Sequence, residues 1–192
     1  MTTAAARPRR ADAERNIARI VAAARATLSR NPDATVDDVA KAAGVGRMTV
    51  YGHFRTRPEL VEAALVEALR AGEETLSAVE LGGDARAALG RLLTSTWSLV
   101  AESSALVTAA EGVLPQGRLR ELHAGPAKRV EQLIKRGQRQ GVFRTDLPVG
   151  WLVSSAHYLV KGAAAEIHAG RLEPADAPRL VTESVQSLLA AR

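Results

Sequence analysis

The sequence contains no cysteine and few aromatic residues. None of its 192 residues is cysteine, and only 3% are Phe, Trp or Tyr. The absence of cysteine excludes disulfides, cysteine nucleophiles and cysteine metal ligands, and it is compatible with the reducing cytosol. Alanine is abundant, and apolar residues recur at steps of three or four. This spacing is typical of helices and not of strands, so we predict an all-α fold.

Long apolar segments are also missing. No uninterrupted apolar run approaches the roughly 20 residues that span a bilayer. The opening stretch, "MTTAAARPRRADAERN", has no apolar core of the kind that secretory signals carry. We therefore expect a cytoplasmic protein that does not have a membrane as its partner.

The motifs of common enzyme classes are absent as well. The sequence has no Gly-x-Ser-x-Gly elbow, no His-Glu-x-x-His and no phosphate-binding loop. Its four histidines are never three or four residues apart, so no paired helical metal site is expected: His53, His123, His157 and His168. We expect no enzymatic activity, no metal and no cofactor.

Positive charge is concentrated at the N-terminal end. Residues 1–60 hold eleven Lys or Arg and six Asp or Glu, so their excess of five equals the net charge of the whole chain. The remaining residues are balanced. This asymmetry indicates a module that faces a polyanion, joined to a neutral one. The alternative is a solvated basic tail at residues 7–10 beside a chance fluctuation.

The helix signals divide the chain into about nine helices. "TVDD", starting at Thr35, fits a capping box, and Gly44 fits a left-handed helix end. "TRPE", from Thr56 to Glu59, fits a second capping box. The expected helices start near Asp12, Thr35, Arg47 and Thr56, then cover residues 89–100, a short segment ending near Gly112, residues 130–134, 151–170 and 175–190.

Two short helices joined by a glycine-containing turn, at residues 35–54, are typical of a helix-turn-helix. Rotating the second helix by about 100° per residue places Val50 and Phe54 toward the core. Arg47 lies at its N-terminus, where a recognition helix meets bases, and guanidinium pairs bidentately with guanine. Met48 can contact a thymine methyl. Donors for DNA phosphates are expected from Thr35, Thr49, Tyr51, His53 and Arg57.

The segment "TVDDVAKAAGVGRMTVYGHFRTRPELV", Thr35 to Val61, resembles the DNA-binding domain of tetracycline-repressor-family (TetR-type) regulators. The Ala-Gly-Val turn, the Thr-hydrophobe-Tyr core and the His-Phe ending occur in the family's order and spacing. The resemblance implies the same division of contacts: Arg47 and Met48 at bases, the other five residues at phosphates. Gly46 stands where Ser is frequent, and Gly52 stands where the family often has a larger contact residue.

The resemblance also implies a C-terminal domain that senses a ligand and forms a dimer. We expect a flexible basic tail at residues 1–11, a helix-turn-helix domain at 12–57, and a ligand-binding and dimerisation domain at 58–192. The candidate dimer residues are Ser155, Gly162, Ala163, Val181, Val185 and Leu188. The candidate pocket residues are Trp97, His123, Trp151, His157 and Tyr158. The alternative is that these helices and aromatic residues only complete a monomeric core.

These patterns favour a ligand-responsive transcriptional regulator that binds double-stranded DNA. The family's usual mode predicts a repressor that binds a near-palindromic operator as a homodimer and is released by a small-molecule effector. Two alternatives stay open. One is a helical small-molecule-binding protein or enzyme whose helix-turn-helix does not bind DNA. The other is a basic helical module on anionic membranes.

Overall fold

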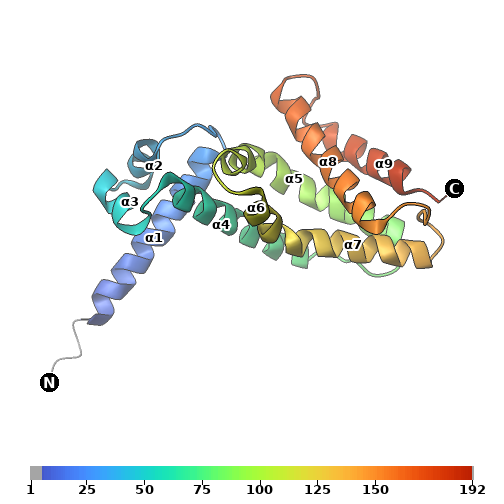
Figure 1. Cartoon of the computed structure of the whole chain (residues 1–192), viewed down its shortest axis with the longest axis horizontal. Helices are drawn as coiled ribbons and strands as arrows, with labels where there is room; N and C mark the ends of the chain where they lie inside the picture. Colours follow the sequence, from blue (N-terminus) through green and yellow to red (C-terminus); the bar gives the residue numbers. More distant parts are fainter. Residues whose placement is uncertain (1–5, 192) are drawn as a thin grey trace. The chain divides into compact units, whose positions relative to one another are not determined.

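The computed structural model describes residues 6–191, and within this range it contains nine α-helices and no β-strand. The all-α prediction is confirmed. Among the described residues, no helix has both the length and the apolarity needed to cross a bilayer. The helices, drawn in Figure 1, are α1 (Ala6–Leu28), α2 (Val36–Ala43), α3 (Arg47–His53), α4 (Arg57–Ser77), α5 (Ala85–Glu111), α6 (Gln116–Leu122), α7 (Ala124–Arg139), α8 (Val149–His168) and α9 (Ala177–Leu189).

Helix α1 begins earlier than the sequence suggested. We expected its start near Asp12, but the helix begins at Ala6. Pro8 falls in the first turn, where the N–H groups of a helix have no intrahelical partner, so its missing N–H costs no hydrogen bond there. Residues 1–5 of the expected basic tail lie outside the described residues.

The prediction of a separate short helix ending near Gly112 was wrong. Helix α5 continues without a break to Glu111, and the next helix, α6, begins only at Gln116. The sequence between Val100 and Glu111 contains no glycine or proline, so nothing interrupts the helical hydrogen bonds there. The break instead falls at Gly112–Pro115.

The chain divides into two compact units. One comprises residues up to Leu69 together with Ala105–Leu119, and the other comprises Arg70–Ser104 and Arg120–Arg192. The first unit thus contains α1, α2, α3, the first part of α4, the end of α5 and the start of α6. We expected the boundary after residue 57. Helices α4, α5 and α6 each contribute residues to both units.

The core of the first unit is apolar and comes mainly from α1, α2 and α4. Helix α2 contacts both α1 and α3 (Figure 1). The apolar residues Val36, Val39, Ala40 and Ala43 of α2 are buried, and so is Val50 of α3, at 0% exposure. Burial of one valine side chain such as that of Val50 stabilises the unit by about 1.5–3 kcal/mol. The other core members include Ile20, Ala24, Leu28, Leu60, Val61, Ala64 and Leu65.

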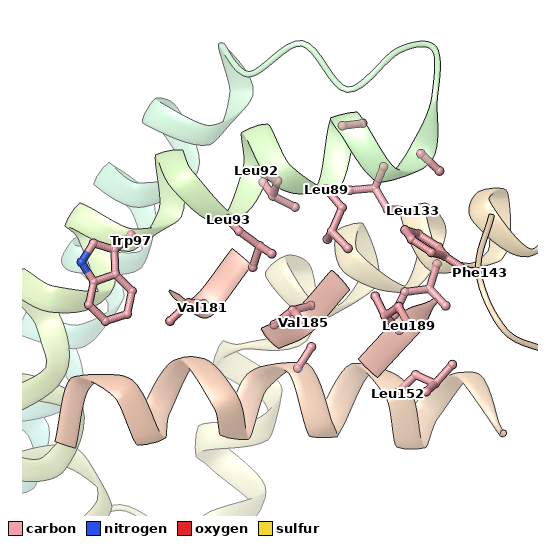
Figure 2. Close-up of a cluster of buried hydrophobic side chains, with 14 of the residues drawn as sticks. Leu89, Leu92, Leu93, Trp97, Leu133, Phe143, Leu152, Val181, Val185 and Leu189 are labelled. Atoms are coloured by element: carbon pink, nitrogen blue, oxygen red, sulfur yellow. The ribbon is translucent and has the colours of Figure 1, made fainter. Parts of the chain in front are cut away.

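The second unit has its own core between α5, α7, α8 and α9. Figure 2 shows side chains from α5, α8 and α9 gathered in one cluster, with Phe143 of the α7–α8 loop among them. The cluster includes Leu89, Leu92, Leu93, Trp97, Leu133, Ile134, Leu152, Val181, Val185 and Leu189.

Phe143 anchors the α7–α8 loop on the backbone of α7. Its ring is 1% exposed and lies directly over Gly137, so close that a Cβ built on that glycine would be 1.9 Å from Cδ2 of the ring. The next residue, Arg144, donates its backbone N–H to Leu189 O at 2.8 Å. The loop therefore joins the end of α7 to the end of α9.

Candidate nucleic-acid interface

Helix α2 begins with a complete capping box. Thr35 Oγ1 accepts from Asp38 N at 3.2 Å, and the Asp38 carboxylate accepts from Thr35 N at 2.8 Å. The Thr35 hydroxyl also donates to the same carboxylate at 2.7 Å. These hydrogen bonds from Thr35, first from its backbone and then from its hydroxyl, lower the pKa of Asp38.

This geometry does not support the prediction that Thr35 holds a phosphate. The amide and the hydroxyl of Thr35 are both engaged with Asp38. The N-terminus of α2 already carries the negative charge that a phosphate would bring. Thr35 is a helix cap in this structure, and its amide and hydroxyl both donate to a carboxylate of the chain itself.

The turn between α2 and α3 is set by glycine. Gly44 has φ +63°, in the left-handed region, as predicted from its place after α2. The backbone N–H of Val45 donates to Ala40 O at 3.0 Å and closes the end of α2. Gly46 is the N-cap of α3 and supplies no side-chain hydrogen bond. The turn therefore starts α3 without a side-chain cap.

Helix α3 has one buried side and one outward side. Val50 is completely buried, while Met48 is 80% exposed although its side chain is apolar. Arg47 and Thr49 are also exposed, and Tyr51 and His53 are half-buried. Phe54, expected in the core, is half-buried because it is the C-cap, with an extended backbone that leaves the helix.

Arg47 is held by two neighbours. Its Nη1 donates to Asp37 Oδ2 of α2 at 2.8 Å. Its Nη2 lies 3.5 Å from the Tyr51 hydroxyl, and its Cζ lies 5.3 Å from the centre of the Tyr51 ring. The hydrogen bond to Tyr51 and the charge of Asp37 raise the pKa of Arg47. The guanidinium stays charged and remains at the surface of the domain.

Arg57 is half-buried and holds a loop of its own domain, while its role as a phosphate clamp stays a prediction. Its Nη2 donates to Pro32 O at 2.7 Å, and its Nε donates to Ala34 O at 3.4 Å. Both carbonyls belong to the loop that leads into α2. Arg57 therefore fixes this loop against the first residue of α4.

The second capping box is only partly as predicted. Thr56 Oγ1 accepts from Glu59 N at 3.3 Å, which is the expected cap. The Glu59 carboxylate accepts from the backbone N–H of Arg55 at 2.8 Å, one residue before the predicted partner. The side chain thus reaches further back and fastens the α3–α4 turn.

The five candidate pocket residues do not surround one cavity. Trp97 is buried in the core of the second unit at 6% exposure, while Trp151 and Tyr158 are 61% and 68% exposed. His123 and His157 face each other edge to ring, with centroids 6.2 Å apart. An open hollow of about 540 Å³ lies elsewhere in this unit, and none of the five lines it; its lining residues are Thr75, Ala78, Val79, Glu80, Arg91, Thr94 and Ser95.

The candidate dimer residues separate into two groups. Val181 and Val185 are 4% and 0% exposed and belong to the core of their own unit, so their assignment to an interface was wrong. An apolar stripe on α9 is covered by the same chain. The other candidates remain accessible at least in part: Gly162 is exposed, and Ser155, Ala163 and Leu188 are half-buried.

Sequence reasoning missed Asp37 as part of this surface. Asp37 is ten residues from Arg47, and only the fold of the turn brings them together. The available signal was an acidic residue in the first turn of the first short helix and a basic residue at the start of the second. Across the described residues, no group of three or more His, Asp or Glu is placed to hold a metal ion.

One family model and several solved structures are similar to this chain. Residues 20–64 match the family described as bacterial regulatory proteins, tetR family. A comparison with curated proteins gave no significant match.

Several solved structures share the fold over nearly the whole chain. The TetR-like regulator LfrR from Mycobacterium smegmatis, solved with proflavine, is 22% identical to this chain and has a TM-score of 0.73. The match covers 93% of this chain and 98% of LfrR. A protein of Saccharomonospora viridis assigned as a transcriptional regulator, solved with choline, is 19% identical with a TM-score of 0.76, covering 93% of this chain and 100% of that one. The fatty acid degradation regulator FadR from Bacillus halodurans is 19% identical to this chain and has a TM-score of 0.72. The match covers 92% of this chain and 97% of FadR.

Proposed function

We propose that the chain is a TetR-type repressor that a small-molecule effector releases from its operator; residues 20–64 match the model of that family. The observation that carries the proposal is the outward side of α3. Arg47, Met48 and Thr49 are exposed there, while Val50 closes the opposite side on the core. A helix that is anchored on one side and offers cationic, apolar and hydroxyl groups on the other fits a DNA major groove.

The contacts divide between bases and phosphates. Arg47 recognises guanine through the N–H groups that it presents side by side, and the exposed Met48 contacts a thymine methyl. Thr49, Tyr51 and His53 donate to phosphates and fix the register of the helix. Arg57 fixes the loop that leads into α2 through Pro32 and Ala34 and contacts a phosphate from the start of α4.

A homodimer brings two such helices to one operator. Helix α8 exposes Trp151 and Tyr158, which are seven residues apart and share one side of the helix with Ser155 and Gly162. Large exposed apolar side chains in one stripe mark a contact surface. A dimer with two-fold symmetry places its two α3 helices about 34 Å apart, or a multiple of this distance, and therefore binds a near-palindromic sequence.

The second unit supplies the effector response. Helix α4 contributes residues to both units, so a ligand that prefers one position of α4 changes the placement of the DNA-binding helices. Two structures of the same fold were solved with small molecules, choline and proflavine. A small-molecule effector is accordingly proposed for this chain as well.

Selection from random duplexes with purified protein tests the proposal. We expect a near-palindromic consensus and an affinity that falls steeply as salt rises, because phosphate contacts release counterions. Arg47→Ala should relax the preference at one or two positions of each half-site at a cost of about 1–3 kcal/mol. Recovery of no consensus, with no duplex bound even in dilute buffer, would refute DNA-binding regulation.

A further inference from the structure

Asp37 faces the surface that approaches DNA, where a negative charge is unfavourable. It lies in the first turn of α2, and its Oδ2 is 2.8 Å from Nη1 of Arg47. The Asp37 and Arg47 side chains are 56% and 58% exposed, so the pair is in contact with water. A carboxylate in this position repels phosphates, and its presence next to the proposed base-reading residue requires an explanation.

The pair restricts what Arg47 can do. One side of the guanidinium is fixed by Asp37, and the Tyr51 ring and hydroxyl limit it on another side. The other N–H donors of the guanidinium remain available for an acceptor. Without Asp37, the long arginine side chain would be free to turn to the nearest phosphate and bind every sequence alike.

We infer that Asp37 is a positioning residue that makes Arg47 a reader of base sequence and prevents it from serving as a phosphate contact. This inference rests on the proposed DNA-binding function. The paired guanidinium and carboxylate together carry no net charge, so they add little to the attraction that any duplex exerts. Arg47 contributes binding free energy only where a guanine accepts hydrogen bonds from its remaining guanidinium N–H groups in the fixed geometry. Asp37 thus raises specificity at the expense of general affinity.

Asp37→Asn tests the inference against a matched control, Asp33→Asn. Asp33 is also an exposed acid of the first unit, and within the described residues it forms no ion pair. Both substitutions remove one negative charge, but only the first frees Arg47. The full-length variants are compared on the selected operator and on a scrambled duplex, each at several salt concentrations, after circular dichroism has shown an unchanged helix content.

We expect Asp37→Asn to bind the scrambled duplex more tightly and to increase the salt slope by about one, because Arg47 gains a phosphate. The ratio of operator to scrambled affinity should fall about tenfold, with the loss concentrated at the position that Arg47 reads. Asp33→Asn should leave this ratio unchanged. In an Arg47→Ala background, Asp37→Asn should no longer alter the ratio.

The outcomes separate the two claims. If the wild type selects a sequence and Asp37→Asn keeps the same ratio, the positioning role is overturned while the proposed function stands. An equal rise in affinity for both duplexes also overturns the positioning role, because Asp37 would then act only by repulsion. If the wild type binds no duplex, the proposed function fails and this inference fails with it.

Discussion

Replacement of Gly137 by alanine should destabilise the second unit, although alanine is the better helix former. A Cβ at this position would lie 1.9, 2.5 and 2.7 Å from Cδ2, Cε2 and Cγ of Phe143. Atoms of the ring itself are involved, and the ring is 1% exposed within the core, so it has no free space to rotate into. Overpacking of this kind costs about 1–3 kcal/mol. The upper limit is loss of the ring's packing, about 3–5 kcal/mol.

Gly72 provides the matched control for this substitution. It is also a buried glycine inside a helix, but its added Cβ would meet only Leu99 Cδ1, at an ordinary contact distance of 3.6 Å. Gly72→Ala should therefore show the helix preference alone, a gain of about 0.5–1 kcal/mol. Subtracting the same gain from the overpacking cost leaves a net loss of about 0–2.5 kcal/mol for Gly137→Ala when the ring stays in place.

Thermal and urea unfolding at one protein concentration measure both variants. For a chain of this size, 1 kcal/mol corresponds to roughly 2–4 °C in Tm. The two alanine substitutions should shift Tm in opposite directions. In a double-mutant cycle, Gly137→Ala with Phe143→Leu should lose less than the sum of the two single losses, because the smaller side chain leaves room for the Cβ. If Gly137→Ala and Gly72→Ala stabilise the protein equally, the close contact between the Phe143 ring and Gly137 is refuted.

Three further predictions concern the DNA-binding unit and the dimer. Arg57→Ala and Arg57→Lys should both destabilise the first unit by about 1–3 kcal/mol in urea unfolding, because neither side chain spans the two loop carbonyls; if lysine restores stability, charge alone explains Arg57. Since the pKa of Asp38 is lowered in the folded protein, its contribution is complete above its ordinary value of 3.8 and disappears as pH falls through the lower folded value. Unfolding curves between pH 2 and 7 should thus show a smaller acid loss for Asp38→Asn, and an unchanged loss contradicts the capping role. Tyr158→Glu should convert the dimer to a monomer in light scattering, whereas Ala175→Glu, at an exposed loop position, should not; a dimer in both variants would exclude this side of α8.

Local sequence chemistry predicted the ends of the short helices. The Thr35–Asp38 box and the left-handed Gly44 each depend on residues within one helical turn, so the sequence contains the information. The rotation of α3 was predictable for the same reason, because its period places Val50 inward and Met48 outward. The continuity of α5 to Glu111 was not predicted, although the sequence after Val100 contains no glycine or proline before Gly112.

Contacts between elements were not predictable in the same way. Arg57 meets Pro32 across 25 residues, and Arg47 meets Asp37 across the turn, so both depend on how the helices pack. The stripe of Val181 and Val185 shows a further limit. Apolar spacing says that a side of the helix is covered, but it does not say whether the cover comes from the same chain or from a second copy.

The hydrogen bonds of Arg57 couple the start of α4 to the loop that precedes α2. Arg57 is the first residue of α4, and its guanidinium donates to the carbonyls of Pro32 and Ala34. Ala34 directly precedes Thr35, the N-cap of α2. Any tilt of α4 at this end must carry the α2 entry along or break both bonds. An effector response that travels through α4 and keeps both bonds would therefore move the loop before α2 together with α4.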